Sequence, residues 1–409
     1  KVYLISVFFQ NYFLCLYYKM GGGLMQLVAY GAQDIYLTGN PQITFFKVVY
    51  RRHTNFSMEA IEQTLNGSAG YGNKVSSTVS RNGDLVGRMY VEYTQSNNDA
   101  TATANPGSAL IDNVEVEIGG QRIDKHYGHW MEAWAQLTES NPTGANPTSA
   151  DVPISSSDAT QFTEFQRMSG MGGVLGATDT MERLFIPLQF WFCRNPGLAL
   201  PLIALQYHEV KVILTFNTAA ASGGNSTFGT AQLWADYIYL DTDERRRFAQ
   251  VSHEYLIEQV QFQEEASSTS MSLNFNHPVK ELVWTGGVTT GGPSATTGPS
   301  TPKTAATGVS YKLTLNGHDR FAERNFRYFT RCQVWQHHTG HGSVNVADSI
   351  AVYSFALKPE EHQPSGTCNF SRIDNAQLKL NTAQALNIYA VNYNVLRIMS
   401  GMGGLAYSN

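Results

Sequence analysis

Short alternating segments run along most of the chain and are separated by turn residues. Residues 85–94 read LVGRMYVEYT and residues 111–118 read IDNVEVEI, so in both segments apolar side chains recur two positions apart. That period places them on one face of an extended segment and predicts β-strands. The same criteria predict further strands over residues 43–50, 184–192, 210–216, 233–240, 255–262, 279–284 and 311–315.

Three ranges depart from this alternation. Residues 138–180 are rich in Asn, Pro, Gly, Ser and Thr and show little apolar periodicity, which predicts one long surface excursion. Residues 241–250 read DTDERRRFAQ, with acidic residues first and basic residues last. Because the helix dipole favours that order, we predict a helical connector there. A second short helix is predicted over residues 198–205.

The strand pattern occurs twice along the chain. Four segments of the first half match segments of the second half in the same order, namely 116–122 with 313–320, 188–192 with 353–357, 210–217 with 376–382, and 233–240 with 386–396. Gly120 and Gly317 are 197 residues apart, whereas Leu214 and Leu380 are 166 apart. The second copy therefore lacks most of the 138–180 excursion. Strand order is kept while loop length changes, as expected for two copies of one scaffold.

Each copy contains about eight short strands and no helix of core length, the pattern of an antiparallel jelly roll. We therefore predict an all-β fold of two tandem eight-stranded antiparallel jelly rolls with short connecting helices. The predicted divisions are an N-terminal jelly roll at residues 20–240, a connector at 241–250 and a C-terminal jelly roll at 251–409.

The first nineteen residues form a separate apolar stretch. Gln10 and Asn11 interrupt this stretch, and no small-residue cleavage site follows it. It is also shorter than the roughly 20 residues that a membrane-spanning helix needs. We therefore interpret residues 1–19 as lying upstream of a natural start at Met20, rather than as a signal peptide or membrane anchor.

Composition narrows the classes of function. Hydrophobic residues make up 42% of the 409 residues and charged residues 15%, a profile typical of a well-folded, β-rich protein. The net charge of -5 gives no field that attracts nucleic acid. The one dense basic run, residues 245–247, follows three acidic residues of 241–244, which we expect to neutralise it. Four singly scattered cysteines predict reduced thiols and no metal site.

Three separated motifs carry a resemblance to a known family. They are GGGLMQLVAYGAQDIYLTGNPQITFFKVVYRRHTNF at 21–56, DTDERRRFAQ at 241–250 and PSGTCNFSRIDNAQL at 364–378. Together they resemble the major capsid proteins of nucleocytoplasmic large DNA viruses, and the resemblance covers residues 20–409. It implies two jelly rolls standing side by side, normal to the capsid surface. It also implies that three chains form a pseudo-hexagonal capsomer, which tiles an icosahedral shell above an internal membrane.

The resemblance implies a structural protein with no enzymatic activity and no cofactor. The implied partners are further copies of the chain in a homotrimer, together with penton and minor capsid proteins. No direct contact with nucleic acid is expected, and the internal membrane is expected to be met only indirectly. The expected location is the virion, after assembly in the host cytoplasm. The alternative function is a glycan-binding, lectin-like or host-attachment jelly-roll protein, which would remain a discrete species.

The stretch 364–380 supplies the main candidate contact residues. Turn residues open it and an alternating strand closes it. In the first copy its place is taken by residues 195–209, which have no comparable charge pattern, so we predict a contact used once per chain. Arg372 and Asp374 are expected to hold the loop or a neighbouring subunit. The full set of structural or interface candidates is Phe370, Arg372, Asp374, Asn375, Arg245 and Arg246.

Histidine clusters offer a rival hypothesis of a metal site. The run HHTGH at 337–341, or His126 with His129, has enough imidazoles for a divalent metal. The run at 337–341 is flanked by glycine and has no acidic residue nearer in sequence than Asp348, which favours a surface loop. Adjacent carboxylates such as Glu360-Glu361 are predicted to be solvated. The sequence contains no GxSxG, GxxxxGK[ST] or HExxH motif.

Four asparagines lie in the Asn-x-Ser/Thr pattern of glycosylation acceptors. Asn225, within ASGGNSTFGT, has the most loop-like surroundings, and Asn66 is the second candidate. Asn369 lies inside the 364–380 stretch, so we expect it to form structural hydrogen bonds instead. Glycosylation at any of these positions depends on exposure of the protein to a glycosylation machinery.

Overall fold

The computed structural model describes residues 22–29, 31–94, 103–146, 162–175, 183–219, 227–286, 300–303 and 308–407. The chain divides into two units, residues 1–53 and residues 54–409. The described residues of the first unit form two short helices, α2 (Gly22–Val28) and α3 (Ile35–Thr38). Asp34 precedes α3, and its carboxylate Oδ2 accepts a hydrogen bond from the Gly31 N–H at 2.7 Å.

The strand predicted over residues 43–50 does not form, so that prediction is wrong. These residues are extended or in turns, and all of their side chains are exposed. β-branched and aromatic residues favour a strand only where a neighbouring strand completes the hydrogen-bond ladder. None of the described residues pairs with this segment.

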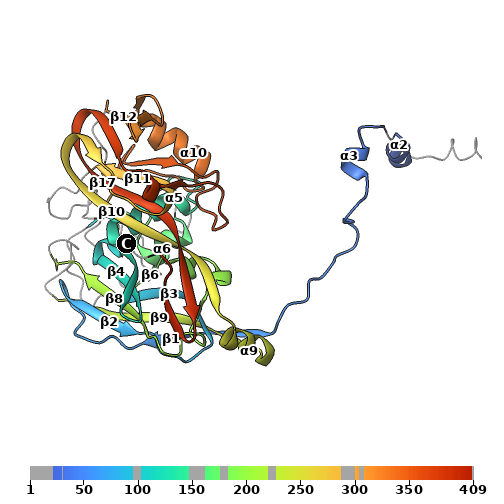
Figure 1. Ribbon diagram of the computed structural model, residues 1–409, viewed down its shortest axis with the longest axis horizontal. Helices are drawn as coiled ribbons and strands as arrows, with labels where there is room; N and C mark the ends of the chain where they lie inside the picture. The colour runs from blue at the N-terminus through green and yellow to red at the C-terminus, as the bar shows by residue number, and fades with distance from the viewer. Residues whose placement is uncertain are drawn as a thin grey trace, which may run out of the picture. The chain divides into compact units, whose positions relative to one another are not determined.

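The first jelly roll consists of two antiparallel sheets that enclose one core (Figure 1). One sheet has the order β1-β9-β3-β6, with β7 beside β3, and the other has the order β2-β8-β4-β5. The strands are β1 (Phe56–Gln63), β2 (Lys74–Thr78), β3 (Leu85–Thr94), β4 (Ile111–Ile118), β5 (Gln121–Tyr127), β6 (Arg183–Pro187), β7 (Leu200–Pro201), β8 (Val210–Phe216) and β9 (Thr230–Leu240). Alternation places Met89, Val91 and Tyr93 of β3 in the core, as predicted.

The second jelly roll is built around two long strands, β10 (His253–Ser272) and β17 (Ala376–Met399), which pair along their length. Register shifts interrupt the pairing between Glu265 and Ser270. Such irregularities let one strand pass from one sheet of a sandwich to the other. The remaining strands are β11 (Pro278–Gly286), β12 (Ser310–Leu315), β13 (His318–Asp319), β14 (Arg324–Asn325), β15 (Ile350–Ser354), β16 (Cys368–Asn369) and β18 (Met402–Leu405).

The two rolls repeat one topology. The second half of β17 lies between β10 and β11, and β15 follows β11, so the order β10-β17-β11-β15 matches β1-β9-β3-β6. The first half of β17 pairs with β12, which pairs with β13, as β8 pairs with β4 and β4 with β5. The hairpin β4–β5 turns at Gly119-Gly120 and the hairpin β12–β13 turns at Asn316-Gly317. In each turn both residues have positive φ. The fold is therefore mostly β and a double jelly roll.

Helices connect the strands at a few points. One of the predicted helices is confirmed, whereas the predictions for residues 184–192 and 198–205 are partly or wholly wrong. α9 (Thr242–Gln250) is the helix predicted for residues 241–250. The strand predicted over residues 184–192 ends at Pro187, which cannot donate a ladder hydrogen bond, and α7 (Trp191–Arg194) follows. The helix predicted over residues 198–205 is replaced by a single 3-10 turn, η2 (Pro196–Leu198), and by β7.

The 138–180 range contains more order than predicted, over the part that the structure describes. α6 (Glu164–Ser169) lies within it and begins with a capping box between Thr163 and Gln166. Two helices precede the range, α4 (Pro106–Leu110) and α5 (Gly128–Thr138). In the second roll, a π-helical turn, η3 (Tyr328–Cys332), runs into α10 (Gln333–His337), and a 3-10 turn, η4 (Phe370–Arg372), follows β16.

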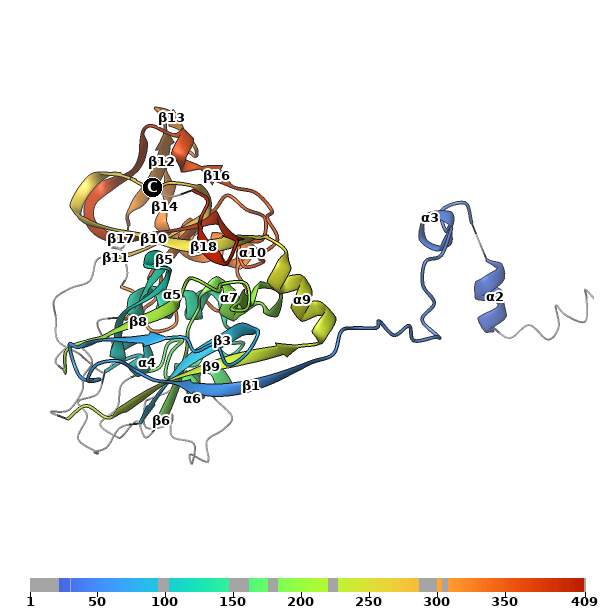
Figure 2. The same cartoon turned by 60° about the horizontal axis from the view of Figure 1, so that its bottom comes forward.

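None of the helices in the described part of the chain has the length and apolar character needed to cross a lipid bilayer. Figure 2 shows the second roll, in yellow to red, beside the first roll, in blue to green, with α5 at their junction. Because both rolls belong to the unit of residues 54–409, the contacts between them define how each roll presents its outer faces.

Candidate functional site

The contact between the two rolls is organised by α5, which was not predicted. Trp130 and Trp134 lie four residues apart and therefore share one face of this helix. They pack against Val283, Val352 and Tyr389, which point outward from the sheet β10-β17-β11-β15. The ring centroids of Trp130 and Tyr389 are 5.0 Å apart. We call this contact the roll–roll interface; its buried members are Trp130, Ala133, Trp134, Leu137, Val260, Val283, Val334, Ile350, Val352, Tyr389 and Val391.

His129 lies at the same interface. Its Nδ1 lies 3.0 Å from the Tyr389 hydroxyl, and burial lowers the pKa of His129 to about 4. The imidazole is therefore neutral at pH 7. His126 lies on β5 instead of on the helix, with its Nε2 2.8 Å from Asp124 Oδ2. Among the residues that the structure describes, no group of three His, Cys, Asp or Glu side chains could hold a metal ion.

Glu132 anchors the described end of the 138–180 excursion against α5. Its buried carboxylate accepts hydrogen bonds from Gln136 Nε2 at 2.6 Å, from Ser108 Oγ at 3.1 Å and from the Gly173 N–H at 2.9 Å. The N–H of Gly172 also donates to it, at 3.1 Å. Burial raises the pKa of Glu132. The donors satisfy a carboxylate that would otherwise be costly to bury.

His338 contradicts the prediction that residues 337–341 form a surface loop. Its side chain is buried, with Nε2 3.0 Å from Glu281 Oε2 and Nδ1 3.0 Å from Glu360 Oε1. Burial alone would lower the pKa of His338, but the two carboxylates outweigh it and raise that pKa to about 9. His338 is therefore an imidazolium held between two acids. The acids are distant in sequence, which is why spacing alone did not find them.

The same contact shows that the prediction of a solvated Glu360 side chain is wrong. Besides His338, Glu360 accepts hydrogen bonds from the Thr339 N–H and from Thr339 Oγ1, both at 2.8 Å. Thr339 Oγ1 also lies 3.1 Å from the carbonyl oxygen of Thr138 at the end of α5. Glu361 does remain exposed, where it pairs with Lys358 at 2.8 Å. The loop carrying Glu360 is thus tied to the roll–roll interface.

A second ionic cluster crosses between the rolls at Glu258 of β10. Its carboxylate lies 2.8 Å from Arg194 Nη1 of α7, 2.9 Å from Lys280 Nζ and 3.2 Å from His362 Nδ1. Burial raises the pKa of Glu258, but its hydrogen bond with His362 and the charges of Lys280 and Arg194 lower it to about 2. The Lys280 side chain is 0% exposed. A buried lysine of this kind depends on its carboxylate partner.

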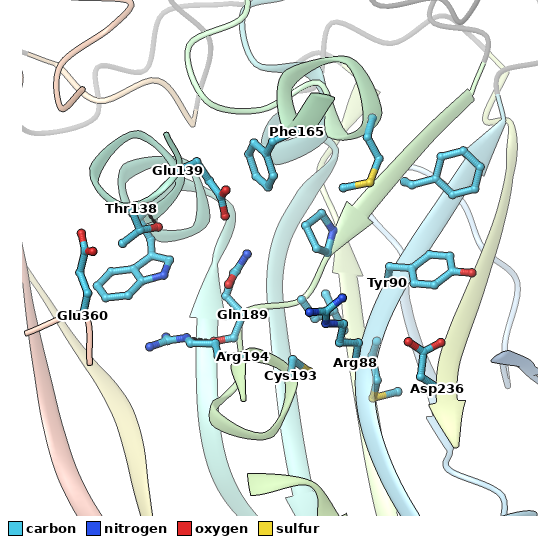
Figure 3. Close-up of a pocket in the computed structure, with 16 residues that line it drawn as sticks. Arg88, Tyr90, Thr138, Glu139, Phe165, Gln189, Cys193, Arg194, Asp236 and Glu360 are labelled. Atoms are coloured by element: carbon cyan, nitrogen blue, oxygen red, sulfur yellow. Dashed lines mark hydrogen bonds between the residues drawn. The ribbon is translucent and has the colours of Figure 1, made fainter. Parts of the chain in front are cut away.

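An open cleft lies over the outward face of the first-roll sheet (Figure 3). It has a volume of about 650 Å³. Tyr90 and Phe185 contribute aromatic rings from the sheet, and Phe165 comes from α6 on the opposite side. Arg88 and Asp236 lie at the sheet end of the cleft, and Thr138, Glu139 and Glu360 lie near its other end. The cleft therefore combines apolar surface with charges of both signs.

The 364–380 stretch is held mainly by polar contacts of its backbone. Phe370 is buried in the second-roll core. Asn369 Oδ1 accepts from the Ser371 N–H at 3.1 Å, the structural role expected for Asn369. The N–H of Asn375 donates to Asn316 Oδ1 at 3.0 Å.

The charged candidates Arg372 and Asp374 are exposed and take part in none of the ion pairs between described residues. The loop is therefore closed without a salt bridge between them. Their predicted contact with a neighbouring subunit stays a prediction, as does that of Asn375, whose side chain is also exposed.

The remaining candidates lie at the surface. Arg245 pairs with Asp84 of the first roll, with Nε and Oδ1 3.0 Å apart, while Arg246 is exposed. Asp241 caps α9 instead of neutralising these bases, because its Oδ1 accepts from the Thr242 N–H at 2.7 Å. Asn66 is exposed at a turn, where its backbone bridges to Ser76. Asn225 lies outside the described residues.

Comparison with known proteins places this arrangement in a family. The family model described as "Major capsid protein N-terminus" matches residues 44–241, and that described as "Large eukaryotic DNA virus major capsid protein" matches residues 244–404. The chain is 54% identical to the major capsid protein of Pyramimonas orientalis virus and 46% identical to that of Paramecium bursaria Chlorella virus 1. Each alignment covers 95% of this chain and 100% of the relative.

Solved structures agree with the sequence relatives. A quasi-atomic model of the PBCV-1 virus capsid matches with a TM-score of 0.72 at 40% identity, and covers 90% of this chain and 100% of the matched chain. The Faustovirus major capsid protein matches with a TM-score of 0.64 at 14% identity, covering 90% and 94%, which supports the fold alone. The chain belongs to the family of major capsid proteins of large eukaryotic DNA viruses.

Proposed function

We propose that three copies of this chain form a homotrimer of pseudo-hexagonal outline, and that such trimers tile an icosahedral shell. The observation that carries the proposal is the roll–roll interface, which fixes two rolls of one topology into a single unit. Three such units supply six similar rolls, so closed three-fold symmetry can approximate a six-fold outline. The likeness to a chain in the PBCV-1 virus capsid supports this role.

The proposal extends to the partners and location of the protein. The exposed loops of the rolls would contact neighbouring trimers, penton proteins and minor capsid proteins. A net charge of -5 does not favour direct contact with nucleic acid, and the internal membrane would be met only through other proteins. The protein would act without catalysis, be assembled in the host cytoplasm and reside in the virion. Residues 20–240, 241–250 and 251–409 would form its two rolls and their connector.

Native mass spectrometry and electron microscopy of the purified protein test the proposal together. We expect a species of three times the chain mass of 45.2 kDa, with a hexagonal outline in projection. A protein that remains a monomer at high concentration would contradict it. Binding to a glycan array by such a monomer would favour the lectin-like alternative. The same mass spectra would show whether Asn66 or Asn225 carries a glycan.

A further inference from the structure

Within one chain, the roll–roll interface has a donor side and an acceptor side. The donor is α5, which begins directly after β5 of the first roll and presents Trp130 and Trp134. The acceptor is the outward face of the sheet β10-β17-β11-β15 in the second roll. Because the rolls share one topology, each roll should contain both sides. Only one donor and one acceptor are used within the chain, so one of each is left over.

The unused acceptor is the outward face of β1-β9-β3-β6. In the second roll, neighbouring residues across the strands form the row Val352, Val283, Tyr389 and Phe262, which α5 covers. In the first roll, the corresponding strands form the row Pro187, Tyr90, Trp234 and Glu62.

The two rows differ in how much of them is covered. Val283 is 0% exposed, whereas Tyr90 and Trp234 remain partly exposed and their rings stack at 6.4 Å. The cleft of Figure 3 opens directly over Tyr90.

The unused donor is the helical segment η3–α10. It follows β14 of the second roll and precedes β15, as α5 follows β5 and precedes β6. Phe329 holds the segment to the core of its own roll, and Val334 packs at the roll–roll interface. Trp335 points away from that roll and is 82% exposed. A tryptophan with this exposure is unusual on a protein surface and is the residue type most enriched at the centres of interfaces.

We propose that Trp335 of one copy docks into the cleft over Tyr90 of a second copy. This contact between two chains would repeat the contact that α5 makes with the second roll within one chain. This contact is heterologous, because the two partners use different surfaces, and a heterologous contact closes into a ring when its rotation allows. Six alternating rolls from three chains would complete that ring. The inference rests on the proposed trimer and names the residues that form its subunit contact.

Charge at the two surfaces supports this pairing. Arg327 and Arg331 lie eight and four residues before Trp335, so they share its side of the helical segment. Both are exposed, and Asp348 pairs with Arg331 at 2.7 Å and approaches Arg327 at 4.0 Å. Two arginines and one aspartate leave this donor surface positive.

The cleft is lined by three carboxylates and two guanidinium groups. The carboxylates are those of Glu139, Asp236 and Glu360, and the bases are Arg88 and Arg194. Arg194 is already paired with Glu258, and Glu360 is already paired with His338, which leaves Glu139 and Asp236 against Arg88. The lining therefore offers net negative charge to the Arg327 and Arg331 side of the donor, and such complementarity favours the correct orientation of two copies.

The first test replaces Trp335 with alanine. Since Trp335 is an exposed anchor, Trp335→Ala should leave the folding of the monomer unchanged, as judged by near-ultraviolet circular dichroism. It should raise the concentration at which half the trimer dissociates by at least about tenfold, the effect of losing a central tryptophan. Tyr207→Ala is the matched control, because Tyr207 is 75% exposed and lies in the connection between β7 and β8. A Trp335→Ala trimer as stable as the control would overturn the proposal.

The second test locates the contact. A photoreactive benzoyl-phenylalanine at position 335 should cross-link to a peptide of another copy that contains Tyr90, Phe185 or Asp236. Mixing isotopically labelled and unlabelled chains distinguishes links between copies from links within one chain. A cross-link to any other surface would overturn this docking site while the trimer stands. If the unmodified chain forms no trimer, the proposed function and this inference both fail.

Discussion

The two rolls share strand order and differ in what covers their outward sheets. In the second roll the row centred on Val283 is buried beneath α5, and in the first roll the row centred on Tyr90 borders an open cleft. The buried row is mostly apolar, whereas the open row includes Glu62 and is flanked by Arg88 and Asp236. The difference indicates that one scaffold provides both a buried interface within the chain and an open surface with charges of both signs.

The polar groups near the roll–roll interface also differ in burial from those at the cleft. Glu258 and His338 are buried and surrounded by partners of opposite charge. At the open cleft, Asp236 and Glu139 keep contact with solvent, and partial burial raises the pKa of each. Buried ion pairs add little net stability but require one geometry. We infer that the Arg194–Glu258 pair, which crosses between the rolls, helps to fix the angle between them, while the cleft remains adaptable.

The largest expected effect comes from removing the donor tryptophan inside the chain. Trp130 is 0% exposed, so Trp130→Ala should lower the free energy of unfolding by about 5 kcal/mol, the upper end for a buried tryptophan. Trp335→Ala, at the equivalent place in the second roll, should change it by less than about 0.5 kcal/mol. Urea unfolding of the two variants measures the comparison. Equal losses would contradict the assignment of one buried and one open donor.

Breaking the ionic cluster should have the next largest effect. Glu258→Gln removes the carboxylate that pairs with the buried Lys280, which should cost about 4 kcal/mol. The double variant Glu258→Gln with Lys280→Met removes the stranded charge and should recover more than half of that loss. Urea unfolding again gives the measurement. If the double variant were less stable than Glu258→Gln, the stranded lysine would not be the cause.

The His338 cluster predicts a smaller effect that depends on pH. The pKa of His338 is about 9 in the folded chain and 6.5 as the ordinary value, so the folded state holds the proton more tightly. The contribution of this proton to the free energy of unfolding is complete below pH 6.5 and is lost as the pH rises through 9. The loss should be on the order of 3 kcal/mol across that range. Thermal unfolding of the wild type and of His338→Gln between pH 6 and 10 tests it, and equal slopes would refute it.

Local periodicity predicted most of the strands and the repeat, because each strand alternates between a core and an outer face. It failed for residues 43–50, where β-propensity is high but no described residue completes a ladder. It also missed α5, although Trp130, Met131, Trp134 and Ala135 have helical spacing. That signal was present in the sequence and could have been used.

The polar clusters could not be predicted from spacing. His338 meets Glu281 and Glu360, which lie 57 and 22 residues away in the sequence. Glu258 and Arg194 come from different rolls and are 64 residues apart. The fold of the second roll brings the His338 cluster together, and only the packing of one roll on the other brings Arg194 to Glu258. The sequence motifs therefore favoured a surface loop at residues 337–341, and they did not predict the residues of the roll–roll interface.

The smallest expected effect on stability belongs to the 364–380 stretch, where the charges face solvent. Arg372→Ala and Asp374→Ala should each leave the free energy of unfolding unchanged within about 0.5 kcal/mol, because neither side chain forms an ion pair with a described residue. Phe370→Ala, in the same turn but buried in the core, should cost about 3 kcal/mol.

If Arg372 and Asp374 contact a neighbouring subunit, the two alanine variants should instead weaken the trimer. Sedimentation of each variant across a concentration series separates that outcome from a change in folding. Unchanged sedimentation would remove both residues from the subunit contact and leave Trp335 as its anchor. Weakened trimers with unchanged unfolding would show that the second roll offers two contact points to its neighbours, one on α10 and one on this turn.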